Sequence, residues 1–157
     1  MRKSCHFLVI AGSFLSLWAL LAQGRPSAHA TGDYASDREA IGSVLRAQQS
    51  AWNRANVDAF LQGYWHSPDL AFFSGDQIIR GWESTLQRYR DKYQSTGKEM
   101  GKLSFTDENV QMLGSHAALV TARWHLEMKD GKRLEGLTTL LCKRLKEGWR
   151  IVHDHSS

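Results

Sequence analysis

The spacing of apolar residues changes from a helical period to a period of two at Lys102, and this change constrains the fold most strongly. Four strand-like runs follow it, over residues 103–113, 117–129, 132–146 and 149–155. The connections between these runs are too short for helical crossovers, and Asp130-Gly131 is a strong hairpin signal. The second half of the chain therefore predicts an antiparallel meander.

Three helical segments are expected before these strands. Ser36-Asp37-Arg38-Glu39 has the pattern of a capping box, and an apolar stripe follows it at three- and four-residue spacing. Asn56 is a typical N-cap for a shorter helix that extends to Tyr64, and Gly81 precedes a third helix. Two short strands are expected at 70–73 and 77–80. Helices followed by strands predict an α+β fold, with the helices on one face of a strongly curved, mostly antiparallel sheet.

Strict alternation divides the run over residues 117–129 into two faces. One face is apolar and is expected to contact the helices: Ala118, Val120, Ala122, Trp124, Leu126 and Met128. Arg123 and His125 lie on the other face. They would lie at the interface of a homodimer built sheet to sheet, or be solvated in a monomer.

The first thirty residues have the pattern of a signal peptide. Arg2 and Lys3 precede an apolar run from Phe7 to Ala22, and Ala28-His29-Ala30 is a small-residue cleavage pattern. Because the run is shorter than a membrane span of about 20 residues, no stable membrane anchor is expected; the alternative is an uncleaved N-terminal anchor. The predicted division is a signal peptide (1–30) cleaved near Ala30, a short lead-in (31–36) and one domain (37–157). The mature protein is expected in the periplasm or outside the cell.

Removal of this segment changes the charge balance. The chain has 20 Lys and Arg against 16 Asp and Glu, and three of the basic residues lie before residue 31. The mature chain thus has 17 basic residues against 16 acidic ones, and no basic run remains to bind nucleic acid. Cys142 becomes the only cysteine and is expected to be a buried thiol without a disulfide. No cofactor is predicted, because no phosphate-loop or dinucleotide fingerprint occurs.

Aromatic side chains are the first candidate for a functional site. The set comprises Trp52, Tyr64, Trp65, Trp82, Tyr89, Tyr93 and Trp124. Such side chains either form a plain hydrophobic core or line a cavity for a flat apolar ligand, with phenol and indole groups as donors. The ligand-binding residues predicted on the second interpretation are Trp52, Tyr64, Trp65, Trp82, Tyr89 and Trp124.

His153-Asp154-His155 is the second candidate. On a strand the two histidines project to one face and the aspartate to the other. A histidine with a carboxylate from another element would act as a general base near neutral pH, so His125, His155 and Asp154 are candidate catalytic groups. Alternatively, Asp154 and His155 tie the chain end to loops or to a second subunit. No metal site is predicted, since no HExxH motif or cysteine pair accompanies these histidines.

Several local strings, in this order, resemble secreted SnoaL-like proteins, the DUF4440-type members of the nuclear transport factor 2-like superfamily. They are Gly63-Tyr64-Trp65, Gly81 to Leu86 followed by Tyr89 and Tyr93, Met100 to Leu103, Trp124-His125-Leu126, Gly136 to Leu140 and Asp154 to Ser157. The resemblance covers residues 37–157 and implies a cone of three helices wrapped by a bent sheet that encloses a pocket. Relatives on this fold include ketosteroid isomerase, scytalone dehydratase, polyketide cyclases and a non-catalytic association domain, so the fold alone does not define an activity.

The predicted function is therefore the binding of a small apolar or aromatic molecule by a secreted, homodimeric SnoaL-like domain. One alternative is an isomerase, dehydratase or cyclase in which His125 or His155 is the acid–base group and Tyr64 or Tyr89 the electrophile. A second alternative is an oligomerisation module without a ligand. The isomerase relatives use a carboxylate near the first short strand, whereas residues 70–73 here are Leu-Ala-Phe-Phe, which cannot abstract a proton.

Overall fold

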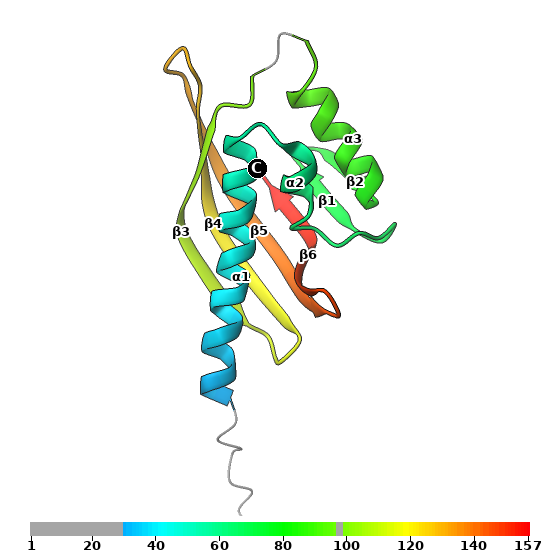
Figure 1. The fold of residues 1–157 in the computed structure, drawn as a ribbon, viewed down its shortest axis with the longest axis vertical. Helices are drawn as coiled ribbons and strands as arrows, with labels where there is room; N and C mark the ends of the chain where they lie inside the picture. The colour runs from blue at the N-terminus through cyan, green and yellow to red at the C-terminus, as the bar shows by residue number, and fades with distance from the viewer. Residues whose placement is uncertain (1–29, 97–98) are drawn as a thin grey trace, which may run out of the picture.

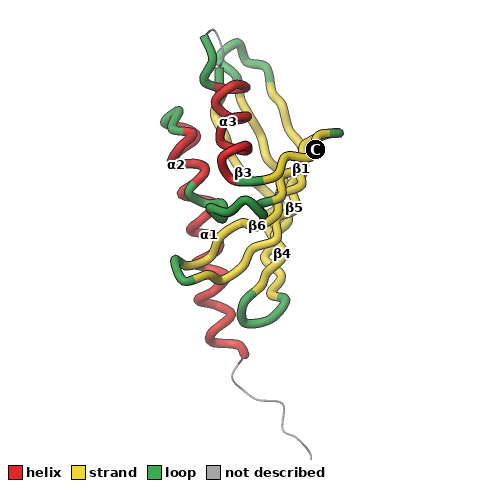
Figure 2. Tube along the Cα trace, turned by 90° about the vertical axis from the view of Figure 1, so that its right-hand side faces the viewer, coloured by secondary structure: helices red, strands yellow, loops and turns green. Residues whose placement is uncertain are grey.

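The computed structural model describes residues 30–96 and 99–157, where three helices lie on one side of a six-stranded sheet (Figures 1 and 2). The helices are α1 (Ala30–Asn53), α2 (Val57–Leu61) and α3 (Trp82–Tyr93). The strands are β1 (Ala71–Ser74), β2 (Gln77–Arg80), β3 (Lys102–Met112), β4 (Ala117–Glu127), β5 (Arg133–Leu145) and β6 (Gly148–Ser156). This arrangement confirms the predicted α+β cone of helices on a curved sheet.

The strand order in the sheet is β2-β1-β6-β5-β4-β3. Strands β3 to β6 form the predicted antiparallel meander, and β1 and β2 form a hairpin. The hairpin joins the meander through a parallel pairing of β1 with β6, in which Phe72 lies opposite Asp154. This pairing brings a segment from the first half of the chain beside the C-terminal strand, which no local pattern predicts.

A bulge bends strand β3. The β3–β4 register shifts between Thr106 and Asn109, where Asp107 has a φ of 54°. A bulge adds an unpaired residue and increases the local twist of a strand. The long strands therefore curl around α1 instead of lying flat beneath it.

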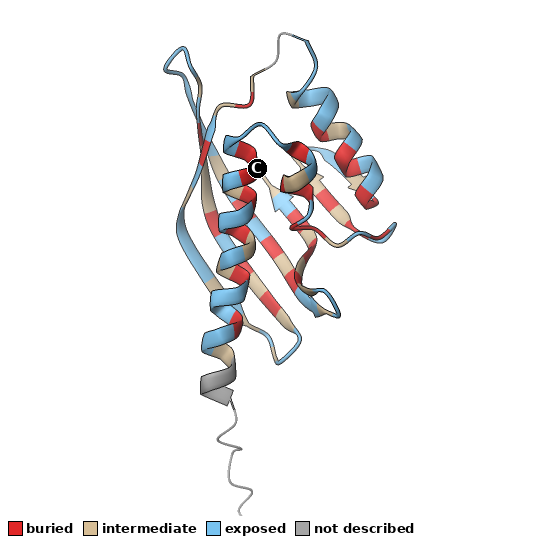
Figure 3. Ribbon diagram, in the orientation of Figure 1, coloured by how far each residue is buried: buried red, intermediate tan, exposed pale blue. Residues whose placement is uncertain are grey.

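The core lies between α1 and the inner face of the sheet, as the buried positions in Figure 3 show. Ile41, Leu45 and Trp52 recur along one face of α1 and are at most 4% exposed. On β4, the predicted inner residues Ala118 and Val120 are fully buried. The predicted faces of β4 are therefore confirmed.

The first two helices differ from their predicted bounds. Helix α1 begins at Ala30, so the predicted lead-in at 31–36 is helical and the capping box at Ser36 is wrong. No proline lies between Ala30 and Ser36, and the Glu39 carboxylate pairs with Arg46 instead of turning back to cap the helix. Helix α2 begins at its predicted N-cap, where the Asn56 side chain accepts a hydrogen bond from the Ala59 amide at 2.9 Å.

Tyr64 lies beyond the end of α2 instead of inside it. The Trp65 amide donates to the Ile151 carbonyl at 2.9 Å, and the Ile151 amide donates to the Gly63 carbonyl at 3.0 Å. The chain thus leaves the helix to pair with β6, and this pairing positions the Tyr64 side chain beside that strand.

Most of the predicted signal peptide, residues 1–29, lies outside the described residues. Within the part of the chain that is described, no helix combines the length and the apolar character that a membrane crossing requires.

Candidate functional site

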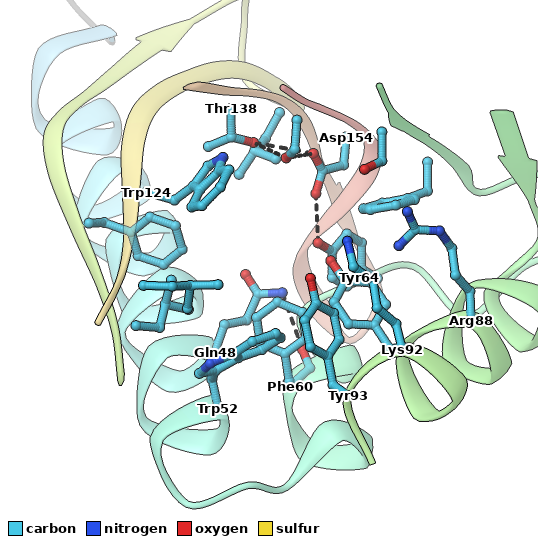
Figure 4. Close-up of a pocket in the computed structure, with 18 of the residues that line it drawn as sticks. Gln48, Trp52, Phe60, Tyr64, Arg88, Lys92, Tyr93, Trp124, Thr138 and Asp154 are labelled. Carbon is cyan, nitrogen blue, oxygen red and sulfur yellow. Dashed lines mark hydrogen bonds between the residues drawn. The ribbon is translucent and has the colours of Figure 1, made fainter. Parts of the chain in front are cut away.

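A cavity of about 220 Å³ lies between the helices and the inner face of the sheet. Its wall is mainly apolar and aromatic, with a small number of polar groups from α1, α3, β1, β5 and β6, among them the Gln48 side chain (Figure 4). Ligand sites in proteins commonly have this composition, with a few polar groups that orient the ligand. The volume exceeds the roughly 150 Å³ of a cavity that holds benzene and falls below the roughly 300 Å³ of a small drug-binding pocket.

Asp154 is the polar centre of this cavity. Its side chain is almost fully buried, at 3% exposure, and projects from β6 to the inner face of the sheet. The Tyr64 hydroxyl donates to Oδ2 at 2.7 Å, and the hydroxyls of Ser156 and Thr138 donate to Oδ1 at 2.7 and 3.2 Å. Figure 4 shows Tyr64 and Thr138 on two sides of this carboxyl. All three donors carry hydroxyls, and Asp154 forms no salt bridge with any described residue.

Burial sets the protonation of these groups. Desolvation raises the pKa of Asp154 above its ordinary value of 3.8, although the hydrogen bonds from Tyr64, Ser156 and Thr138 act in the opposite direction. Burial and then the charge of Asp154 raise the pKa of both Tyr64 and Tyr89 well above 10.0. The two phenols therefore remain protonated donors at neutral pH, beside a carboxyl that takes up a proton more readily than an exposed aspartate does.

Four of the six predicted ligand-binding aromatics line the cavity: Trp52, Tyr64, Tyr89 and Trp124. The Trp52 ring packs edge-on against Tyr93 at 4.7 Å between ring centroids, and its indole N–H donates to the Met100 carbonyl at 3.1 Å. The indole N–H of Trp124 is buried and has no hydrogen-bond partner within the described residues. Trp52, Tyr64 and Tyr89 therefore belong both to the core and to the cavity wall. The indole N–H of Trp124 is available to donate a hydrogen bond to a ligand.

The other two predicted aromatics lie away from the cavity. The Trp82 ring packs against His66 at 4.1 Å between centroids, and its indole N–H donates to the Leu61 carbonyl at 2.9 Å. Trp65 is half-buried and lines a shallow surface depression with Arg144. Neither ring contributes to the cavity wall, because the segment that carries Trp65 turns outward to pair with β6 and Trp82 is held at the start of α3.

The candidate histidines also lie outside the cavity. His125 is on the outer face of β4, where its ring contacts the Thr106 hydroxyl at 2.9 Å and the Glu135 carboxylate at 3.2 Å. His155 is exposed. The centroid of the Phe73 ring lies 4.8 Å from that of His153 and 6.1 Å from that of His155. Among the described residues no histidine lines the cavity, so the predicted pairing of His125 or His155 with Tyr64 or Tyr89 does not occur.

Sequence reasoning missed several polar groups of the cavity. Thr138 and Ser156 bind Asp154, and Arg88 and Lys92 line the cavity from α3. A usable signal exists for Thr138, because it shares the inner face of β5 with the buried residues Leu140 and Cys142. A polar residue on an otherwise apolar face indicates a buried polar contact. No comparable signal marks Arg88 and Lys92, which lie on a helix with many charged residues.

Potential metal ligands and the thiol of Cys142 are the other reactive side chains of the described residues. Within residues 30–96 and 99–157, no three His, Cys, Asp or Glu side chains are grouped so that they could hold a metal ion. Cys142 is buried, and desolvation raises the pKa of its thiol to about 12, so the thiolate needed for nucleophilic attack is not formed at neutral pH.

The chain is similar to known proteins over most of its length. A family model described as a SnoaL-like domain matches residues 41–157. The chain is 36% identical to a nuclear transport factor 2-like protein of unknown function from Shewanella oneidensis, over 76% of this chain and 98% of that one, with a TM-score of 0.72. No curated protein matches the chain.

More distant structures share the fold. A nuclear transport factor 2-like superfamily protein from Salmonella enterica is 22% identical over 79% of this chain and 92% of that one, with a TM-score of 0.64. A protein of unknown function with a cystatin-like fold from Nostoc punctiforme is 12% identical over 78% of this chain and 90% of that one, with a TM-score of 0.65. The DUF4440-type assignment made from the sequence stays a prediction.

Proposed function

Because the chain belongs to the SnoaL-like domain family of the nuclear transport factor 2-like superfamily, we propose that it binds a small, mostly apolar or aromatic molecule in its cavity. The observation that carries this proposal is the Asp154–Tyr64 pair at the end of an aromatic wall. Burying a carboxyl costs free energy, so its retention in an apolar cavity favours a role toward a ligand. A ligand oxygen would accept from Trp124, and a ligand hydroxyl would donate to Asp154.

Native mass spectrometry of the protein, purified from an exporting host without denaturation, tests the binding proposal. We expect an additional mass that disappears on denaturation. Leu126→Phe places a larger side chain in the cavity wall and is expected to lose that mass. Leu113→Phe is the matched control, since Leu113 is 52% exposed outside the cavity. Absence of a bound mass in the wild type, or equal retention by Leu126→Phe, would contradict the proposal.

Proton transfer by Asp154 is a second candidate function. A raised pKa makes a carboxylate a stronger base, and the indole N–H of Trp124, which has no partner among the described residues, is free to donate to a developing oxyanion. In this role Asp154 would remove a proton from a carbon next to a carbonyl and return it to the same molecule. Of the three predicted catalytic candidates His125, His155 and Asp154, only Asp154 lines the cavity, so it is the acid–base candidate.

Hydrogen–deuterium exchange at the α-carbon of 2-indanone, followed by NMR in D₂O, tests this second function. We expect the wild type to accelerate exchange and Asp154→Asn to abolish the acceleration. His155→Gln is the matched control and is expected to keep it, because His155 is exposed. Unaccelerated exchange with the wild type would leave binding as the function of the cavity.

We also propose that the protein is exported and cleaved near Ala30, on the basis of the N-terminal pattern. The intact mass of the exported protein tests this, and a mature chain that begins close to Thr31 is expected. Recovery of the full-length chain from the membrane fraction would contradict it.

A further inference from the structure

Two basic side chains stand at the solvent edge of the cavity. Arg88 and Lys92 are one helical turn apart on α3, so their side chains leave the same face of that helix. Both line the cavity; Arg88 is half-buried and Lys92 is exposed. Figure 4 shows them extending from α3 on the side of the cavity opposite Trp124. We call this edge, formed by Arg88 and Lys92, the cavity mouth.

Neither cation at the cavity mouth forms a salt bridge with a described residue. The Arg88 guanidinium lies 5.2 Å from the centre of the Phe72 ring, and its Nε donates to the Gln77 amide oxygen at 3.4 Å. The Lys92 ammonium lies 5.2 Å from the centre of the Tyr93 ring. Aromatic faces hold both cations in place but leave their charge uncompensated.

Arg90, on the same helix, provides a contrast. It pairs with Asp58 and does not line the cavity. The charge of Arg90 is thus already neutralised by a contact within the protein. The two cations at the mouth keep their capacity to bind an anion.

The inner end of the cavity has the opposite electrostatic character. Asp154 lies there with Tyr64, and a second carboxylate placed beside Asp154 would meet like-charge repulsion in a poorly solvated site. Between this end and the mouth, Phe60, Phe72 and Tyr89 form an apolar wall. A ligand with one anionic group would therefore be oriented by its charge, with that group at the mouth and a neutral group near Asp154.

From this polarity we infer that the ligand is a single-ring aromatic monocarboxylate, with its carboxylate bound by Arg88 and Lys92. The inference rests on the proposed binding function and adds the class of ligand. A volume of about 220 Å³ accommodates one ring with a short side chain and is too small for a skeleton of the size of a steroid. A neutral hydroxyl on the far side of the ring would reach the Asp154–Tyr64 pair.

Isothermal titration calorimetry with a matched pair of probes tests this inference. The probes are 4-hydroxyphenylacetate, which carries the carboxylate, and 4-hydroxyphenylacetamide, which has the same shape without the charge. We expect the wild type to bind the acid about tenfold more tightly than the amide, because two cations contribute. Added salt should weaken binding of the acid but not of the amide.

Substitutions of Arg88 and Lys92 test whether the cavity mouth causes the tighter binding of the acid. Lys92→Gln and Arg88→Gln are each expected to weaken binding of the acid about three- to fivefold and to leave the amide unchanged. Thermal melts check that both variants fold. If Arg88→Gln unfolds because it loses the packing on Phe72, Arg88→Lys is used in its place, since it keeps the positive charge and should keep the preference for the acid. Arg90→Gln is the matched control and is expected to bind both probes as the wild type does.

The outcomes separate the inference from the binding function. If acid and amide bind the wild type equally, or if Arg90→Gln has the same effect as the mouth variants, the assignment of a carboxylate ligand is overturned while the cavity remains a binding site. If neither probe binds, the single-ring carboxylate class is overturned, and the bound mass in native mass spectrometry decides the binding function separately.

Discussion

Replacing Asp154 with asparagine separates the titration of the buried carboxyl from its packing. The asparagine oxygen can accept the hydrogen bond from Tyr64, and its amide can donate to Ser156 and Thr138, whose hydroxyls are able to accept as well as donate. The shape and the three contacts are thus retained, and the ability to bind or release a proton is lost.

The expected effect has a definite sign and a definite pH range. Because the pKa of Asp154 is raised above 3.8 in the folded protein, the folded state keeps a proton that the unfolded state has released. The stabilisation from this proton is complete below pH 3.8 and is lost as the pH rises through the raised pKa. Each pKa unit by which folding raises the pKa of Asp154 corresponds to about 1.4 kcal/mol of unfolding free energy. As the pH rises from 3.8 through the raised pKa, the wild type should lose this free energy relative to Asp154→Asn.

Urea unfolding followed by circular dichroism, at a series of pH values from acidic to neutral, measures this difference. Asp76→Asn serves as the reference, because it makes the same chemical change at an exposed position in the turn between β1 and β2. Parallel stability profiles for the wild type and Asp154→Asn would refute the reasoning. So would a wild type that gains stability relative to Asp154→Asn as the pH rises.

Three further predictions follow from packing, burial and surface charge. Gly136→Ala should destabilise the fold by about 3 kcal/mol in urea unfolding, because the new Cβ would overlap the Ser157 backbone oxygen; Gly42→Ala, which meets only a flexible side chain, should not. Cys142 should react with a thiol reagent only after urea unfolding, since burial raises its pKa to about 12, and equal rates in the native protein would contradict this. If the outer sheet face forms the homodimer predicted from the sequence, Arg123→Glu should yield monomers in sedimentation velocity; an unchanged oligomer would count against that interface.

Local patterns in the sequence determined the elements and the orientation of side chains within them. The period of two located β4 and assigned Ala118 and Val120 to its inner face, because successive side chains on a strand point to opposite sides. The same rule separated Asp154 from His153 and His155. The N-cap at Asn56 followed from a short-range hydrogen bond that the residue type itself supplies.

Only the tertiary structure decided which of these side chains meet in a site. Alternation shows that Asp154 and His155 face opposite ways, but the parallel pairing of β6 with β1 and the curl of the sheet decide that Asp154 faces inward. Trp82 and Trp124 are the same residue type, yet one packs at the start of α3 and the other lines the cavity. The packing of α3 against the rest of the fold brings Arg88 to the cavity mouth. Contacts of this kind join residues far apart in the chain, so the local spacing of apolar residues does not predict them.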